Sequence, residues 1–217
     1  MTPLPERAVY RSRWSALHGG YQPPPAGAAD RWLTLVEAVA RPLAAKGVPA
    51  TAVTLAGVVS GVAAAGAAGR RPLAAAGALA LSALADGVDG SVAVLAGSAS
   101  AWGSVVDSMA DRVADAAALV ALTRLGAPSR LATSAGAAVV ALEYARARAG
   151  AAGFTDIGVV TVGERPMRLA TTFAGLLAAA LLPGRRSASG TAAAAGILGL
   201  GTAGAVQFLR TARAALR

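Results

Sequence analysis

Five of the chain's eleven acidic residues fall within thirty positions, in the segment from Asp86 to Asp115. The surrounding residues are mostly Ala, Val, Leu and Gly, at a density typical of membrane-spanning helices. In a helix, Asp86 and Asp89 would share one face, and so would Asp107 and Asp111. Carboxylates in such apolar surroundings are costly and usually hold a cation or an ion pair. Two helices that each offer a carboxylate pair could bind one or two hard divalent cations through oxygen ligands.

Small residues accompany these acids, namely Gly90, Ala93 and Gly103. They would keep a groove open and let a ligand approach the backbone closely. The alternative interpretation is a solvated helix face in a soluble, alanine-rich bundle. We favour a functional site because polar residues within membrane spans are rare and usually functional.

The acids and small residues together form one pattern, Asp86-x-x-Asp89-Gly90-x-x-Ala93, nine further residues, and Gly103-x-x-x-Asp107-x-x-x-Asp111. This pattern resembles the signature of the CDP-alcohol phosphatidyltransferase family, and it fixes seven positions over twenty-six residues. The resemblance implies that the four acids bind two divalent ions, Mg²⁺ or Mn²⁺, which hold the diphosphate of a donor such as CDP-diacylglycerol. It further implies that Asp111 deprotonates the acceptor alcohol, and that Gly90 and Ala93 line the cytidine-nucleotide site.

One position departs from the family pattern, because Val94 stands where the family usually has Arg directly after the motif Ala. That cation would be expected to hold the nucleotide-side anion or to order the acids. All four acids are present, so we predict altered specificity rather than loss of catalysis. The alternative is a degenerate, non-catalytic paralogue that binds metal or nucleotide. A cation transporter would instead place its acids at mid-bilayer, on broken helices.

The composition favours a membrane protein, since 55% of the 217 residues are hydrophobic and 14% are charged. The predicted fold class is all-α: an integral membrane bundle of six transmembrane helices preceded by an N-terminal juxtamembrane amphipathic helix. The amphipathic helix covers residues 28–46 and would lie either in the membrane interface or against its own protein. Residues 1–27 are predicted to be a cytoplasmic, partly disordered tail, and residues 28–217 the transferase-like membrane domain. The six predicted spans cover about residues 49–68, 73–95, 102–124, 131–148, 167–183 and 190–209.

The net charge of +9 raises the question of a nucleic-acid partner, but no nucleic-acid module accompanies it. The basic residues lie between the apolar segments, which favours attraction to anionic lipid and to phosphorylated substrates. With six spans, the side that holds both termini would carry thirteen Lys and Arg residues, and the other side six. This bias predicts a multi-pass cytoplasmic membrane protein with both termini and the active site in the cytoplasm.

A second group of charged residues lies on the same predicted side, and consists of Arg146, Arg148, Arg165 and Arg168. These arginines either reflect topology alone or bind the anion of a phosphorylated acceptor, because the guanidinium fork matches phosphate. The segment from Tyr144 to Arg148, followed by Glu164-Arg165, resembles that of actinobacterial phosphatidylinositol phosphate synthases. This resemblance points to inositol phosphate as the acceptor, with glycerol phosphate or another alcohol as the alternatives, and the family implies a homodimer.

Arg112 lies within the motif helix and has a simpler predicted role. Arg112 and Asp115 are three positions apart, so they would lie on the same helix face and form an ion pair.

Overall fold

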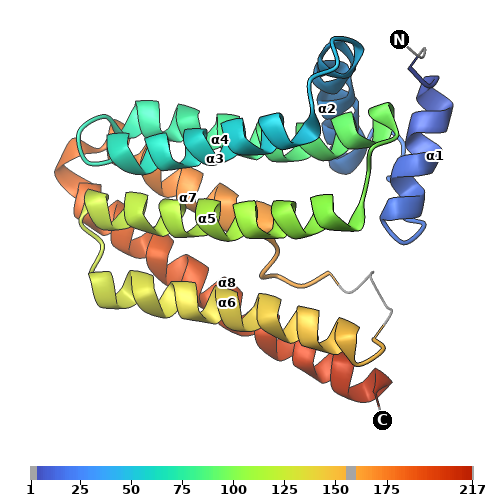
Figure 1. Ribbon diagram of the computed structural model, residues 1–217. Helices are drawn as coiled ribbons and strands as arrows, with labels where there is room; N and C mark the ends of the chain where they lie inside the picture. Colours follow the sequence, from blue (N-terminus) through green and yellow to red (C-terminus); the bar gives the residue numbers. More distant parts are fainter. Residues whose placement is uncertain (1–3, 155–159, 217) are drawn as a thin grey trace. The chain divides into compact units, whose positions relative to one another are not determined.

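The computed structural model describes residues 4–154 and 160–216, and these residues form helices and contain no strand (Figure 1). The all-α prediction is therefore confirmed for the described part of the chain. The elements are α1 Arg7–Leu17, α2 Ala28–Ala45, α3 Ala50–Ala67, α4 Pro72–Ala96, α5 Ala101–Leu125, α6 Ser129–Ala151, α7 Arg165–Leu181, the short 3-10 helix η1 Pro183–Arg185, and α8 Arg186–Ala215.

The helices begin and end where the sequence contains helix-breaking residues. Pro72 is the first residue of α4, a position where its missing N–H group costs nothing. Gly97 ends α4 with a φ of +64°, which residues with a Cβ rarely adopt. The Gly97 N–H donates to the Val94 carbonyl and the Ser98 N–H donates to the Ala93 carbonyl, the two bonds of a Schellman motif. This termination leaves a four-residue loop, 97–100, between α4 and α5.

Three segments of the described chain are long and apolar enough to cross a membrane: α3, α4 and the stretch Pro183–Ala215 that contains α8. The six predicted spans are thus only partly supported by length and composition. Helix α5 has 25 residues but contains Asp107, Asp111, Arg112 and Asp115. Helix α7 has 17 residues, at the short end of what a bilayer requires.

The chain forms two compact units, and each has its own core. The first unit comprises residues 1–59 and 81–111, and the second unit comprises residues 60–80 and 112–217. Helices α3, α4 and α5 contribute residues to both units. Helices α1 and α2 belong to the same unit as the acidic motif.

In the first unit, α1 and α2 pack against the motif half of α4. The buried cluster consists of Tyr10, Leu33, Val36, Ala40, Ala44, Val53, Val88, Val92, Val94 and Leu95. The apolar face of α2 therefore contacts its own protein, the second of the two arrangements considered above. Pro42 does not end α2, which continues to Ala45. The predicted tail contains α1, which the sequence did not reveal because Tyr10 is the only residue of α1 that is buried.

Close packing of α2 on α4 is centred on Gly87, directly after Asp86. A Cβ atom on Gly87 would lie 2.9 Å from Val36 Cγ1 and 3.0 Å from Trp32 Cζ2. A side chain at position 87 would therefore force Val36 or Trp32 to shift. The helix face beside the first motif acid is therefore fixed by direct contact with α2.

The second unit contains α6, α7 and α8, and α8 packs along both α6 and α7 (Figure 1). Its core combines larger residues such as Leu122, Val139, Leu176 and Ile197 with many alanines. Small residues allow close approach of these helices, since a Cβ on Gly175 would lie 2.7 Å from the Ala193 Cβ.

Candidate active site

Three motif carboxylates converge in the first unit. Asp86 lies on α4, and Asp107 and Asp111 lie on α5. One carboxylate oxygen from each lies within 4.8 Å of the other two, and all three residues are half-buried. The four-residue loop that follows α4 allows this convergence, because it brings the start of α5 back alongside the motif. Three hard oxygen donors at this spacing suit a divalent cation such as Mg²⁺ or Mn²⁺, which would also offset their mutual repulsion.

Asp89 is held differently from the other three acids. Its residue is 5% exposed, and its Oδ2 lies 2.6 Å from the Thr54 hydroxyl of α3. The Gly90 backbone N–H donates to Asp89 Oδ1 at 2.6 Å. The Thr54 hydroxyl also lies 3.1 Å from the Ala50 carbonyl, but its single proton serves the shorter contact to the carboxylate. The structure therefore gathers three of the four predicted ligands in one group and orients the fourth through Thr54.

Sequence reasoning missed Thr54 as part of this site. The Pro- and Thr-containing opening of α3 was the only signal, and a 35-residue separation from Asp89 gave no reason to connect the two. In the structure, α3 also approaches α4 closely here, since a Cβ on Gly57 would lie 3.0 Å from the Ala85 Cβ.

We expect Thr54→Val to weaken Mn²⁺ binding by about tenfold, because Asp89 would lose the hydrogen bond that orients it. Thr54→Ser should restore the affinity, since it keeps the hydroxyl. Titration of the purified protein with Mn²⁺, followed by calorimetry, measures the effect. Thr51→Val is the matched control, as Thr51 is exposed on the same helix. Equal affinities for Thr54→Val and the control would contradict the role given to Thr54.

The small motif residues border open space. Gly90 is exposed, and a Cβ added there would meet no other atom within 4 Å. Ala93 is half-buried one turn later on α4. Val94, at the position where the signature described above usually has Arg, is 5% exposed and belongs to the apolar cluster of the first unit. The residue that departs from the pattern is thus part of the apolar core.

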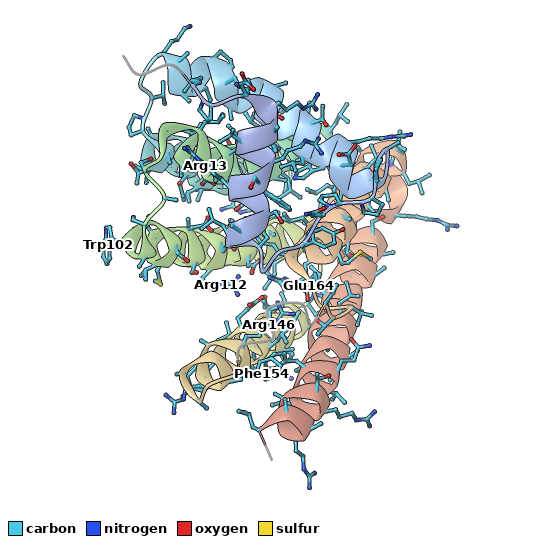
Figure 2. The ribbon with its side chains drawn as sticks, turned by 90° about the vertical axis from the view of Figure 1, so that its right-hand side faces the viewer. Arg13, Trp102, Arg112, Arg146, Phe154 and Glu164 are labelled. Atoms are coloured by element: carbon cyan, nitrogen blue, oxygen red, sulfur yellow. The ribbon has the colours of Figure 1, made fainter. Side chains whose placement is uncertain are left out.

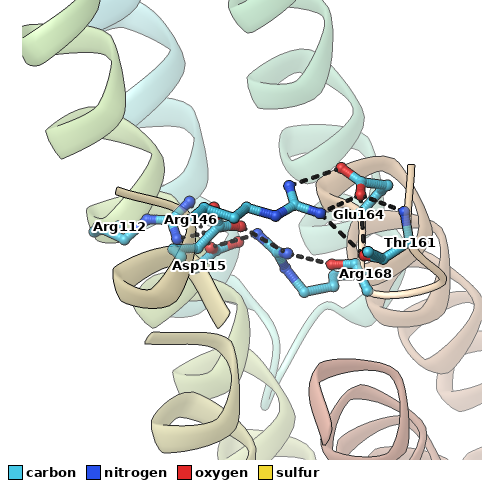
Figure 3. A network of polar contacts seen from close by, with 8 residues as sticks. Arg112, Asp115, Arg146, Thr161, Glu164 and Arg168 are labelled. Carbon is cyan, nitrogen blue, oxygen red and sulfur yellow. Dashed lines mark hydrogen bonds and ion pairs between the residues drawn. The ribbon is translucent and has the colours of Figure 1, made fainter. Parts of the chain in front are cut away.

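Six charged residues of the second unit form ion pairs that we call the arginine network, namely Arg112, Asp115, Glu143, Arg146, Glu164 and Arg168 (Figure 3). At its centre, Arg168 donates to Asp115 Oδ2 at 3.0 Å, to Glu143 Oε1 at 3.2 Å and to the Gly163 carbonyl at 2.5 Å. The Arg168 side chain is 3% exposed. Arg112 Nη2 lies 3.3 Å from Asp115 Oδ2, so the predicted pairing of these two residues is confirmed.

The other part of the arginine network fixes the start of α7. Arg146 donates to both carboxylate oxygens of Glu164, and also to the Thr161 hydroxyl at 3.0 Å. The Thr161 backbone N–H donates to Glu164 Oε1 at 2.8 Å. Burial opposes ionisation of Glu164, but the hydrogen bonds from Arg146 and Thr161 outweigh it and lower the pKa of this carboxyl group. The guanidinium of Arg146 also lies 5.8 Å from the centre of the Phe208 ring.

The four arginines predicted to bind an anion therefore have different surroundings. Arg146 and Arg168 are bonded to carboxylates of the chain itself. Arg148 is exposed on α6, and Arg165 is half-buried at the start of α7. Glu143 and Asp115, which the sequence did not connect with Arg168, are separated from it by 25 and 53 residues.

The geometry can be compared with known proteins. The family model of the CDP-alcohol phosphatidyltransferases matches residues 44–204, which is well over half of the chain and includes all of the converging acids. The chain belongs to this family. Its members are transferases, and the apolar helices α3, α4 and α8 agree with a membrane protein. A search of curated proteins gives no match.

Two solved structures of Mycobacterium tuberculosis phosphatidylinositol phosphate synthase (PgsA1) are similar to this chain. The complex with manganese and citrate has a TM-score of 0.69 at 23% identity, and covers 82% of this chain and 88% of the synthase. The structure with CDP-DAG bound has a TM-score of 0.63 at 23% identity, and covers 82% and 91%. At this identity the likeness establishes a shared fold.

Proposed function

We propose that this phosphatidyltransferase moves the phosphatidyl group of CDP-diacylglycerol, or of a similar CDP-linked lipid, to an alcohol acceptor and releases CMP. The observation that carries the proposal is the convergence of Asp86, Asp107 and Asp111 within 4.8 Å, at positions that match the family signature. The CDP-DAG bound to the mycobacterial synthase supports the choice of donor.

Asp86, Asp89, Asp107 and Asp111 are the proposed ligands of two divalent ions, Mg²⁺ or Mn²⁺. Bound ions would neutralise charge on the donor diphosphate and on the departing CMP. The carboxylate set fits such ions, and the manganese complex of the mycobacterial synthase supports the assignment. Gly90 and Ala93 leave space on α4 for the cytidine nucleotide, because no side chain extends from Gly90.

Asp111 is the proposed general base. It takes the proton of the acceptor hydroxyl as that oxygen bonds to the phosphorus next to the lipid. The bond between this phosphorus and the CMP oxygen breaks, and CMP leaves with the electron pair. Asp111 suits the role because it is half-buried and lies in the group of converging acids.

A phosphorylated alcohol such as inositol phosphate is the proposed acceptor, and Arg146, Arg148, Arg165 and Arg168 are the residues proposed to attract its anion. The exposed Arg148 is the member best suited to direct contact. Arg146 and Arg168 are held by Glu164 and Asp115, so they would act chiefly by shaping the region and by their positive charge.

The remaining proposals concern the membrane. Helices α3 to α8 would cross the cytoplasmic membrane six times, with both termini and the acids on the cytoplasmic side, where the positive residues are concentrated. Trp102 projects from the start of α5 and is 73% exposed, as expected of an aromatic anchor at a membrane surface (Figure 2). A homodimer is proposed from the family resemblance alone.

The test is CMP release from CDP-diacylglycerol by the purified protein, with Mg²⁺ or Mn²⁺ and a panel of inositol phosphate, glycerol phosphate and inositol. We expect release that depends on one acceptor and stops when EDTA removes the metal. If no acceptor supports release although CDP still binds with metal, the protein is the non-catalytic paralogue. The buried Val94 would then be the first position to examine.

A further inference from the structure

A chain of hydrogen bonds links α1 to the motif half of α4. The Tyr10 hydroxyl lies 2.9 Å from the Ser91 hydroxyl, and Ser91 donates to the Gly87 carbonyl at 2.9 Å. A serine hydroxyl has one proton, so the bond to Gly87 leaves Ser91 as the acceptor and Tyr10 as the donor. Tyr10 is 0% exposed and Ser91 is 1% exposed, so water does not compete for this bond.

Tyr10 is suited to act as a permanent donor. Burial raises the pKa of the Tyr10 hydroxyl above its ordinary value of 10.0. The phenol therefore keeps its proton at neutral pH. The chain of bonds ends on the backbone of Gly87, at the same point where Trp32 and Val36 of α2 contact α4.

Ion pairs hold α1 against α2, and they fix the position of Tyr10 relative to α2. Arg7 Nε lies 3.2 Å from Glu37 Oε2, and Arg11 lies 2.5 Å from Asp30 Oδ1. Arg41 of α2 donates to the carbonyl of Pro5, two residues before α1, at 3.1 Å. Both helices thus form one docked layer on residues 86–93, which we call the donor segment.

The position of Val94 connects this layer with the departure from the family pattern. Val94 lies three residues after Ser91, on the same face of α4, and it shares the buried apolar cluster with Tyr10. An arginine there would place a charge in this dry cluster, which is costly without a partner. Helix α1 also lies before the region that the family model matches, residues 44–204.

We propose that Tyr10 is a positioning residue for donor binding: through Ser91 it fixes the donor segment of α4. Asp86, Asp89 and Gly90 all lie within this segment. Greater mobility of the segment would therefore disturb both the positions of the carboxylates and the proposed nucleotide site beside Gly90. The proposal rests on the proposed function, because it concerns the binding of the CDP-linked donor.

The first test measures kinetics with Tyr10→Phe, which removes one hydroxyl and keeps the packing of the ring. We expect the KM for CDP-diacylglycerol to rise by between about twofold and about tenfold, the range of one buried hydrogen bond. The acceptor KM and kcat should change less than the donor KM. Ser91→Ala should raise the donor KM at least as much, because it also removes the bond to the Gly87 carbonyl, and the double variant should be no worse than Ser91→Ala, since Tyr10 then has no partner left to lose. Tyr21→Phe is the matched control, because Tyr21 is 50% exposed.

A second test needs no turnover. Amide hydrogen exchange of the substrate-free protein should be faster across residues 87–93 in Tyr10→Phe than in the parent and in Tyr21→Phe. Unchanged exchange, or faster exchange with an unchanged donor KM, overturns the role of Tyr10. If the parent protein shows no turnover with any acceptor, the proposed function fails instead. The exchange result then decides by itself whether Tyr10 fixes the donor segment.

Discussion

Asp111→Asn should lower kcat for CMP release by about a thousandfold, because the amide cannot accept the proton of the attacking alcohol. The substitution keeps the size of the side chain and one oxygen ligand. Donor binding should therefore fall much less than turnover. The measurement pairs acceptor-dependent CMP release with Mn²⁺-dependent binding of CDP-diacylglycerol to the same preparation.

Glu6→Gln provides the control for Asp111→Asn, since Glu6 is an exposed acid immediately before α1. It should leave both turnover and donor binding unchanged. A variant Asp111→Asn that keeps more than a tenth of the parent kcat would rule out the assignment of Asp111 as the base. The search would then move to Asp107, one turn earlier on α5.

Arg168→Met should have the largest effect on stability. The variant would leave Asp115 and Glu143 without the guanidinium that now lies 3.0 and 3.2 Å from them. Removal of one partner from a buried ion pair typically costs about 3–5 kcal/mol, because the remaining charge is buried without compensation. For a chain of this size the melting temperature should fall by about 10 °C. Thermal unfolding in detergent, followed by circular dichroism, measures the shift.

Arg148→Met tests whether this loss reflects burial rather than charge. Arg148 is exposed, so its substitution should move the melting temperature by no more than about 2 °C. Arg112 remains beside Asp115 in the Arg168→Met variant, at 3.3 Å, and it would offset part of the cost. A melting temperature equal to that of Arg148→Met would show that Arg168 does not stabilise the arginine network.

The sequence predicted most of the helices because their ends carry strong local signals, such as Pro72 and Gly97. The local spacing of the acids within each helix also indicated a shared cluster, of which the structure brings Asp86, Asp107 and Asp111 together, and the sequence predicted the pairing of Arg112 with Asp115. It did not predict α1, because one buried residue, Tyr10, gives no periodic pattern.

The contacts that orient the candidate site were equally hidden from the sequence. Thr54 meets Asp89 across 35 residues, and Tyr10 meets Ser91 across 81. Such contacts depend on which helix faces are packed together, and hydrophobic periodicity does not specify this. The same reason applies to Arg168. Its charge indicated either the cytoplasmic side of the membrane or an anion-binding site, but it did not indicate which acids of the chain Arg168 pairs with.

The charges of α5 have a consequence for how the protein is made. Asp107, Asp111, Arg112 and Asp115 lie within nine residues of one another, and in the proposed six-span topology these charges oppose the insertion of α5. Helix α5 would therefore partition from the translocon into the bilayer inefficiently on its own. The loop 97–100 joins it to the apolar α4, so the two helices can enter the bilayer as one hairpin. Biogenesis of the proposed catalytic centre would then depend on the hydrophobicity of α4 as much as on the acids themselves.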